Sequence, residues 1–369
     1  LNEILASMKE GDRLSGADAF RLYDTYGFPL EVTDEILSER GIDVDRDGFH
    51  MELERQRERS LSSAKVGIVL TASPDVYRSI REAASPTEFL GYETTQAEGK
   101  VVAILVNGSH RERLESGEEG EIILNRTPFY ATGGGQIGDT GILADGHAVF
   151  HVTSTTKPLA DLYVHHGQVS SGKVVVGDVV QASVSEGLRL DTARNHTGTH
   201  ILHAALRSVL GDRATQAGSV VEPDRLRFDF HYSSALTDEQ IHEVERIANE
   251  EIRRNDPVET RVMSLDEAMA DGAIGLFEEK YGDSVRVVSL PGFSKELCGG
   301  THARSSGQIG ELVIVSQESV GSGVRRIEAV TGRRAAEYVR ERLDTLRAIA
   351  QVLPVPETEL PRQVQRLLD

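Results

Sequence analysis

The stretch that decides the fold runs from residue 195 to residue 211 and reads NHTGTHILHAALRSVLG. Its apolar residues recur at helical spacing and Gly211 follows the last of them, which predicts one amphipathic helix. His196 and His200 are four positions apart, so both imidazoles lie on the same face of that helix. Two histidines in this arrangement can bind a single metal ion.

The chain's only cysteine stands much further along, in the sequence CGGTH at residues 298–302. Because two glycines disfavour a helix there, we expect a turn that brings Cys298 and His302 together. A thiolate and three imidazoles suit tetrahedral Zn²⁺, so the two stretches together favour a shared zinc site with one ion per chain. His203 lies on the same helix face and either replaces one ligand or acts behind the ligands. Four protein ligands would close the site, whereas three would leave a position for water or substrate.

Outward from these two stretches, the chain divides into four segments with different patterns. Residues 1–75 read as helices, and residues 76–185 as short β-rich runs separated by Gly, Asn and Asp. Residues 186–335 mix helices with strands, and residues 336–369 begin with a charged amphipathic helix followed by a tail that contains prolines. The fold class we predict is α+β, with a helical N-terminal region, a small antiparallel β-barrel and an α+β domain that holds the zinc site.

Length and composition set wider limits on the function. The 369 residues suffice for two or three domains, and 39% hydrophobic with 27% charged residues is a globular balance. A net charge of −19 argues against a protein that coats nucleic acid nonspecifically, but it does not exclude a local basic surface. One cysteine excludes an intrachain disulfide and fits a reducing, cytoplasmic location. No apolar run is long enough for a membrane helix, so we expect no membrane partner. The first residue is not Met, which suggests a piece of a longer protein.

Two stretches match known ligand patterns but favour other structures. Residues 133–138 read GGGQIG and match the dinucleotide pattern, yet no helix is predicted after them, so we expect a tight turn of the barrel. Residues 43–54 match a calcium-loop pattern. The same residues also read as the start of a helix from Asp47 onward, capped by Asp45 or Asp47, and we favour that interpretation.

Several stretches taken together resemble the alanyl-tRNA synthetase family. They read LYDTYGFPLEVT, TPFYATGGGQIGDTG, HTGTHILHAALR, QAGSVVEPDRLRFDF, LFEEKYGDSVRVVSLPGFSKELCGGTH and GQIGELVIVSQESVGSGVRRIEAVTG, in the order expected for that family. The resemblance implies that 1–75 ends the tRNA-recognition region, 76–185 is a β-barrel subdomain, 186–335 is an editing domain and 336–369 starts a helical linker. It also implies zinc ligands at His196, His200, Cys298 and His302.

The same resemblance implies a function, partners and cofactors. The family's editing domain hydrolyses Ser-tRNA(Ala) and Gly-tRNA(Ala), which makes mischarged tRNA(Ala) the expected partner. ATP and Mg²⁺ would serve only the aminoacylation domain, which would precede residue 1. A homodimer would form through the C-terminal region, most of which would follow residue 369. Two departures from the family pattern stand out: Gly198 replaces the usual Ala of HTATH, and Thr132-Gly133 replaces the Glu-Ser of FYAESGGQ.

Other residues are candidates for binding roles, each with a plainer alternative. Gln216 and Thr215 follow His200 by sixteen and fifteen positions and are candidates for the amino-acid pocket, or else are polar residues of a surface strand. Arg325 and Arg326 are candidates for contact with tRNA phosphates, or else belong to a solvated face. The candidates for supporting the editing cleft, or else for shaping barrel turns, are Tyr130, Asp139, Gly134 and Gly135.

Two other functions remain open from the sequence. The chain could be a non-catalytic tRNA-binding module whose zinc is structural, or a free-standing deacylase that edits in trans. The LYDTYGFP segment, typical of the synthetase's helical region, weighs against the free-standing enzyme. The sequence also leaves open whether zinc would activate water or only position the substrate.

Overall fold

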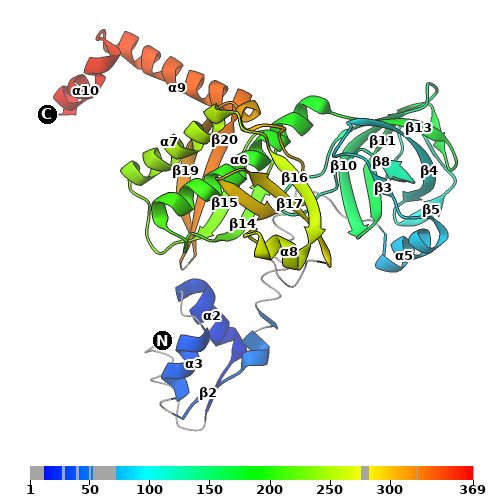
Figure 1. The fold of residues 1–369 in the computed structure, drawn as a ribbon, viewed down its shortest axis with the longest axis horizontal. Coiled ribbons are helices and arrows are strands. Elements are labelled where there is room, and N and C mark those ends of the chain that lie inside the picture. The colour runs from blue at the N-terminus through cyan, green and yellow to red at the C-terminus, as the bar shows by residue number, and fades with distance from the viewer. Residues whose placement is uncertain are drawn as a thin grey trace.

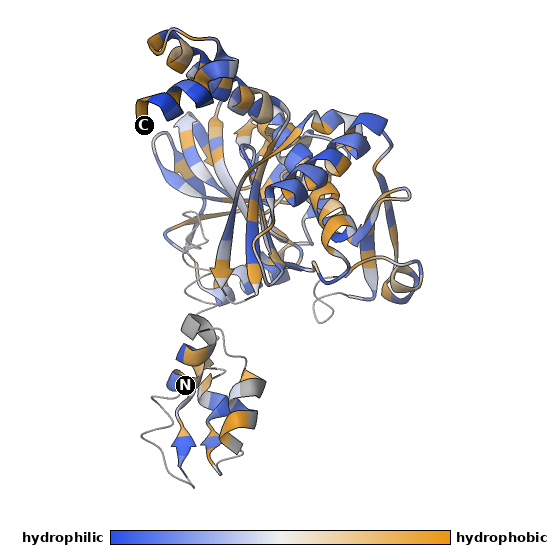
Figure 2. Ribbon diagram, turned by 90° about the vertical axis from the view of Figure 1, so that its left-hand side faces the viewer, coloured by the Kyte–Doolittle hydropathy of each residue, from blue (hydrophilic) through white to orange (hydrophobic). Residues whose placement is uncertain are grey.

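The computed structural model describes residues 12–26, 30–38, 41–49, 51–52, 72–275, 282–321 and 323–368. Figure 1 shows a β-barrel beside an α+β module, with two helices projecting from the module at the C-terminal end. Hydrophilic and hydrophobic residues alternate in bands along the strands and helices (Figure 2), as expected for elements that bury one face.

The N-terminal group has a small core of its own. Its helices are α2 (Gly16–Tyr26) and α3 (Leu30–Ser38), and its strands β1 (Arg13–Leu14) and β2 (Asp43–Val44) pair in parallel. Asp45 Oδ1 accepts a hydrogen bond from the Gly48 amide (3.2 Å), so this aspartate caps a helical turn, as the favoured interpretation expects. Most of the helix predicted from Asp47 lies outside the described residues, as does position 54.

The barrel closes through six antiparallel strands, which confirms the predicted architecture. Neighbouring strands follow the order β13-β9-β10-β11-β7-β4, and β4 pairs back with β13. A closed ring leaves no open sheet edge, and its interior is filled by apolar side chains such as Ile104, Leu143 and Phe150. The strands are β4 (Gln96–Val106), β7 (Glu119–Leu124), β9 (Gly141–Ala144), β10 (Val149–Leu159), β11 (Leu162–Ser171) and β13 (Val179–Val184).

Several short elements complete the barrel. Helix α5 (Pro74–Ala83) packs Tyr77 and Ile80 against barrel residues, so the boundary expected between residues 75 and 76 falls inside this helix. The division into four segments therefore stays a proposal. The short strands are β3 (Glu88–Phe89), β5 (Ser109–Arg111), β6 (Arg113–Glu115), β8 (Arg126–Thr127) and β12 (Lys173–Val175).

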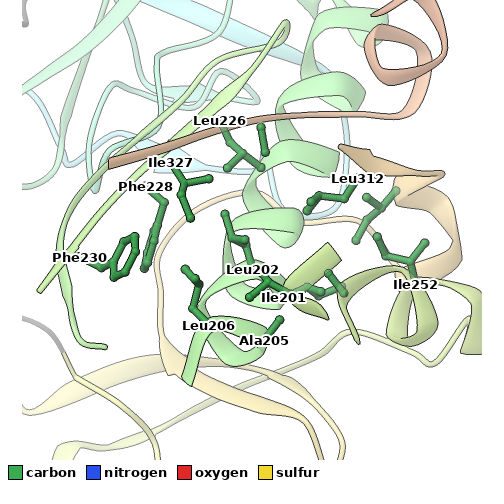
Figure 3. Packing of buried hydrophobic residues seen from close by; sticks show 14 of the residues in the cluster. Ile201, Leu202, Ala205, Leu206, Leu226, Phe228, Phe230, Ile252, Leu312 and Ile327 are labelled. Atoms are coloured by element: carbon green, nitrogen blue, oxygen red, sulfur yellow. The ribbon is translucent and has the colours of Figure 1, made fainter. Parts of the chain in front are cut away.

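The α+β module is built around helix α6 (Glu186–Leu210), which carries both histidines of the HxxxH sequence. This helix begins at Glu186, nine residues before the stretch 195–211 on which it was predicted, because the exposed Leu188 and Leu190 hide its periodicity there. Its apolar face packs on the sheet ordered β14-β15-β20-β19, with Leu202 and Leu206 near Phe228 and Phe230 (Figure 3). The sheet strands are β14 (Gln216–Val221), β15 (Leu226–His231), β19 (Leu312–Gly321) and β20 (Val324–Thr331).

A second sheet and further helices finish the module. Strands β16 (Glu259–Ser264), β17 (Ser284–Leu290) and β18 (Ser294–Leu297) form an antiparallel sheet that leads directly into the CGGTH sequence. Helix α7 (Asp238–Arg254) begins with a complete capping box of Thr237 and Gln240. Of the two short helices, α8 (Leu265–Ala270) contacts β16 and β17, and η2 (Ser306–Ile309) contacts α6 and α7.

The C-terminal helix α9 (Gly332–Val352) matches the single helix predicted there. The proline-containing tail beyond it forms η3 (Glu357–Glu359) and α10 (Leu360–Leu368). Pro361 occupies the first turn of α10, where a missing amide hydrogen breaks no helical bond. Among the described helices, none is long and apolar enough to cross a membrane.

One buried ion pair joins the barrel to α6. Arg189, in the first turns of the helix, pairs with Asp139 of the barrel, and both side chains are almost fully buried. The Arg189 guanidinium also donates to the carbonyls of Gly91 (2.7 Å) and Pro128 (2.8 Å). These bonds satisfy both charges, and truncating either partner would leave a buried charge unpaired.

A buried histidine makes the barrel's stability depend on pH. His165 donates from Nδ1 to the Ile122 carbonyl (2.9 Å), and its Nε2 accepts from the Thr127 hydroxyl (2.8 Å). Burial lowers its pKa to about 4. The unfolded chain binds a proton below about pH 6.5, so unfolding free energy should fall by roughly 3 kcal/mol between pH 6.5 and 4.

We expect His165→Gln, which retains a donor and an acceptor, to lose this pH-dependent contribution. The exposed variant His151→Gln should keep it. Denaturant unfolding at a series of pH values measures both. Equal pH slopes in the two variants would contradict the assignment to His165.

Candidate metal centre

The structure brings four potential metal ligands together in the α+β module. His196 and His200 come from α6, and Cys298 and His302 come from the turn that follows β18. One ligand atom from each residue lies within 4.8 Å of the ligand atoms of the other three. His196 and His200 are buried and the other two are partly buried. One thiolate and three imidazoles are a donor set that fits Zn²⁺.

The glycines of CGGTH allow the turn to pass close to the helix. A Cβ on Gly300 would lie 2.0 Å from His196 Cε1, so no other residue fits without displacing this imidazole. Arg286 holds the turn from outside by donating to the carbonyls of Cys298 and Gly300, each at 2.9 Å. These bonds and the close packing hold the turn against the helix.

Each histidine of the cluster has a partner for its outer nitrogen. The Nδ1 atoms of His196, His200 and His302 lie 2.7 Å from Gln136 Oε1, 2.9 Å from Glu296 Oε2 and 3.1 Å from Thr197 Oγ1, respectively. The Nε2 atoms of His196 and His302 face Cys298 Sγ at 3.4 and 3.3 Å. Metal-binding histidines commonly bond an outer acceptor in this way, which fixes the tautomer that leaves Nε2 free for the ion.

Burial and neighbouring charges set the protonation states in the cluster. Burial opposes the Cys298 thiolate, but His196 and His302 together lower the thiol's pKa well below its ordinary value. Burial lowers the pKa of His302 to about 3, so this imidazole is neutral at neutral pH. Burial also opposes protonation of His200, but Glu296 and Cys298 raise its pKa to about 10. Without a metal, His200 is therefore protonated, and a binding cation would displace that proton.

His203 lies behind the cluster and outside the group of four. Its Nδ1 is 3.2 Å from Glu296 Oε1, while the other oxygen of the same carboxylate contacts His200. Of the two roles left open by the sequence, this position fits support behind the ligands. A cleft of about 870 Å³ opens on this side and is lined by residues that include His203 and Glu296.

The pocket candidates Gln216 and Thr215 lie at the start of β14. Gln216 Nε2 donates to Ser219 Oγ at 3.1 Å, and Thr215 is exposed. Within the part of the chain that the structure describes, no hydrogen bond or ion pair joins either side chain to the four ligands. Ser219 nevertheless touches the glycine turn of the barrel, because a Cβ on Gly135 would lie 2.6 Å from its Oγ.

The tRNA candidates Arg325 and Arg326 project from β20. Arg326 forms a two-bond ion pair with Asp229 (2.7 and 2.9 Å) and also reaches Glu318. Arg325 donates to Gln317 at 3.2 Å. A phosphate would have to displace carboxylates from Arg326, whereas Arg325 has only an amide partner among these contacts.

Within the described residues, no hydrogen bond or ion pair joins the barrel candidates to the four ligands. Tyr130 donates its hydroxyl to the Gly133 carbonyl (3.0 Å), and its amide donates to Asp139. Asp139 is in turn paired with Arg189. Gly134 and Gly135 both have a positive φ, at 58° and 83°, as the tight turn requires.

Two residues of the site were not predicted from the sequence. Gln136 is fully buried behind His196, and Glu296 is almost fully buried behind His200 and His203. The signals in the sequence were only their positions: Gln136 directly follows three glycines, and Glu296 lies two positions before Cys298. Neither signal points to a role beside the metal ligands without knowledge of the fold, because one residue comes from the barrel and the other from β18.

Comparison with known proteins identifies relatives along the whole chain. Residues 1–188 match the family of tRNA synthetases class II (A), and residues 285–328 match the threonyl and alanyl tRNA synthetase second additional domain. Similar proteins include the alanine–tRNA ligases of Bradyrhizobium diazoefficiens (45% identity), Rhodopseudomonas palustris (44%) and Paramagnetospirillum magneticum (46%). Each alignment covers 100% of this chain and 43% of the relative, so the chain spans less than half of their length.

Gly300 provides a test of the cluster that changes no ligand. We expect Gly300→Ala to weaken zinc binding by about tenfold or more, the scale seen when contacts behind a ligand are lost, because the added Cβ displaces His196. Gly299→Ala is the matched control, since a Cβ there meets only Tyr92 Oη at 3.9 Å. Competition with a chromogenic chelator measures both affinities. Equal affinities would show that the ion does not bind beside His196.

Proposed function

Because this chain belongs to the alanyl-tRNA synthetase family, we propose that it performs the family's editing step, hydrolysis of the ester in Ser-tRNA(Ala) and Gly-tRNA(Ala). The observation that carries this proposal is the buried cluster of His196, His200, Cys298 and His302. Two of these ligands lie in the segment that matches the second additional domain. The proposed substrate is the mischarged end of tRNA(Ala).

The proposed zinc site has a specific chemistry. A bound zinc ion would supply a Lewis acid next to the scissile ester, or a fixed cationic point that holds the aminoacyl end. If all four side chains bind the ion, they complete a tetrahedral set, which favours the holding role over activation of a zinc-bound water. The chain's own part is to keep Cys298 ionised through the neighbouring histidines, against the effect of burial, and to keep His302 neutral, chiefly through burial.

Selectivity is the harder part of the proposed reaction, since alanine must survive while both a smaller and a larger residue are removed. An apolar pocket distinguishes a single methyl or hydroxyl by only about 1–3 kcal/mol. A polar pocket can recognise the serine hydroxyl, because alanine leaves the pocket's bonding groups unpaired. We propose Gln216, with Thr215 beside it, for this role. Contacts through Ser219 and Gly135 connect Gln216 to the turn that bears Gln136.

The remaining assignments concern the whole enzyme. We propose that the full-length protein attaches alanine to tRNA(Ala) using ATP and Mg²⁺, acts in the cytoplasm and forms a homodimer through its C-terminal region. Helix α9 leaves an apolar stripe exposed, at Val339, Leu343, Leu346 and Ile349. This stripe gives further C-terminal sequence a surface on which to pack.

One observation favours a second candidate function. Four protein ligands are typical of structural zinc sites, so the module could bind tRNA without hydrolysing its ester. Both functions need zinc and the folded module. They differ only in whether the ester is cleaved.

Deacylation of purified, charged tRNA distinguishes the two functions. We expect the chain to hydrolyse Ser-tRNA(Ala) and Gly-tRNA(Ala) and to spare Ala-tRNA(Ala), and we expect Cys298→Ala to reduce hydrolysis at least about a hundredfold. Zinc content and circular dichroism should accompany each assay. Tight tRNA binding without any hydrolysis would support the structural module. A folded, zinc-free Cys298→Ala chain with full activity would reject any role for the ion.

The contribution of Arg325 is tested through substrate affinity. We expect Arg325→Glu to raise the Michaelis constant for mischarged tRNA several-fold and to leave kcat unchanged, with a larger effect at low salt. Arg340→Glu on the exposed face of α9 is the control for an equal change in charge. Arg326 is left intact because its reversal would oppose Asp229. An unchanged Michaelis constant for the Arg325 variant would exclude this contact.

A further inference from the structure

Tyr92 of the barrel segment donates its hydroxyl to the Gly299 carbonyl (2.6 Å), but the barrel side chain that contacts a ligand histidine of the cluster is that of Gln136. This residue lies in the glycine turn at residues 133–138 and is fully buried. Its backbone is fixed from two sides. The amide and carbonyl of Gln136 pair with those of Gly133, and the next amide, of Ile137, donates to Val221 of the α+β module (3.1 Å). The Gln136 backbone therefore has little freedom to move.

The Gln136 side chain touches both halves of the cluster. Its Oε1 lies 2.7 Å from His196 Nδ1, on α6, and accepts from the Thr301 amide at 2.9 Å, inside CGGTH. Its Nε2 donates to the Thr301 hydroxyl at 2.9 Å. One amide group thus connects the helix that carries two ligands to the turn that carries the other two.

These contacts determine which nitrogen of His196 carries the proton. The Thr301 backbone N–H can only donate, so the Gln136 atom facing it must be the carbonyl oxygen. The same oxygen faces His196 Nδ1, which must therefore be the protonated nitrogen. That tautomer leaves a lone pair on Nε2, the atom that faces Cys298 Sγ at 3.4 Å.

We propose that Gln136 is a positioning residue of the metal site, through which the barrel sets the tautomer and orientation of His196 and holds the CGGTH turn against α6. The inference rests on the metal site proposed above. It makes the barrel a functional part of that site, so zinc binding and the docking of the glycine turn favour each other.

Two substitutions at this position separate positioning from packing. Gln136→Leu keeps most of the volume but offers no acceptor to His196 or Thr301. Gln136→Glu keeps an acceptor for both, and its second oxygen can accept from the Thr301 hydroxyl. We expect the Leu variant to bind zinc about 10–100-fold more weakly and the Glu variant to stay within about threefold of the unmodified chain.

The experiment measures zinc affinity by chelator competition on the whole chain, with circular dichroism to confirm folding. Gln181→Leu, at an exposed position on β13, is the control for an equal change on the barrel surface. Hydrogen exchange at the amides of residues 133–137 provides a second readout. We expect zinc to slow this exchange in the unmodified chain but not in the Leu variant.

The possible outcomes distinguish this inference from the metal site itself. If His196→Ala loses zinc but folded Gln136→Leu does not, the metal site stands and the role of Gln136 is overturned. If the Glu variant binds as weakly as the Leu variant while both fold, loss of shape and not of the acceptor is responsible, which also overturns it. If His196→Ala binds zinc normally, the metal site is rejected.

Discussion

The close approach of the CGGTH turn to helix α6 is the constraint on which the rest of the site depends. The turn passes so near the helix that no side chain fits at Gly300, where a Cβ would overlap His196. This proximity brings one sulfur and three imidazoles within reach of one ion. It also buries them, so their outer nitrogens need polar partners: Gln136 and Thr197 lie at hydrogen-bond distance from His196 and His302, and the Glu296 carboxylate lies 2.9 Å from His200 Nδ1.

Those outer partners come from every side of the cluster. Thr197 belongs to the same helix, Glu296 to strand β18 and Gln136 to the barrel. The donors and acceptors therefore form one layer around the cluster, although their residues are widely separated in sequence. A site supported in this way keeps its geometry through packing and hydrogen bonds, because movement of any ligand would leave a buried polar group unsatisfied.

The sequence was informative where periodicity or rare residues carried the signal. Helical spacing placed His196 and His200 on one face, and the chain's only cysteine indicated the second half of the cluster. Alternating short runs predicted the barrel, which the structure confirms. Long-range contacts had no local signal. Gln136 reads as part of a glycine turn, and the carboxylate pairing of Arg326 depends on Asp229 from a neighbouring strand, ninety-seven positions away. Sheet order brings such residues together, and one sequence does not specify that order.

The ion pair between Asp139 and Arg189 limits how this architecture could be rearranged in evolution. Each module contributes one of the two charges, and the cation also satisfies two carbonyl groups of the barrel. A recombination event that joined this barrel to a foreign helical segment would leave the buried Asp139 carboxylate without a cation, unless the new segment supplied its own guanidinium. Inheritance of the two modules as a single unit is the expected result, even though each has a separate hydrophobic core.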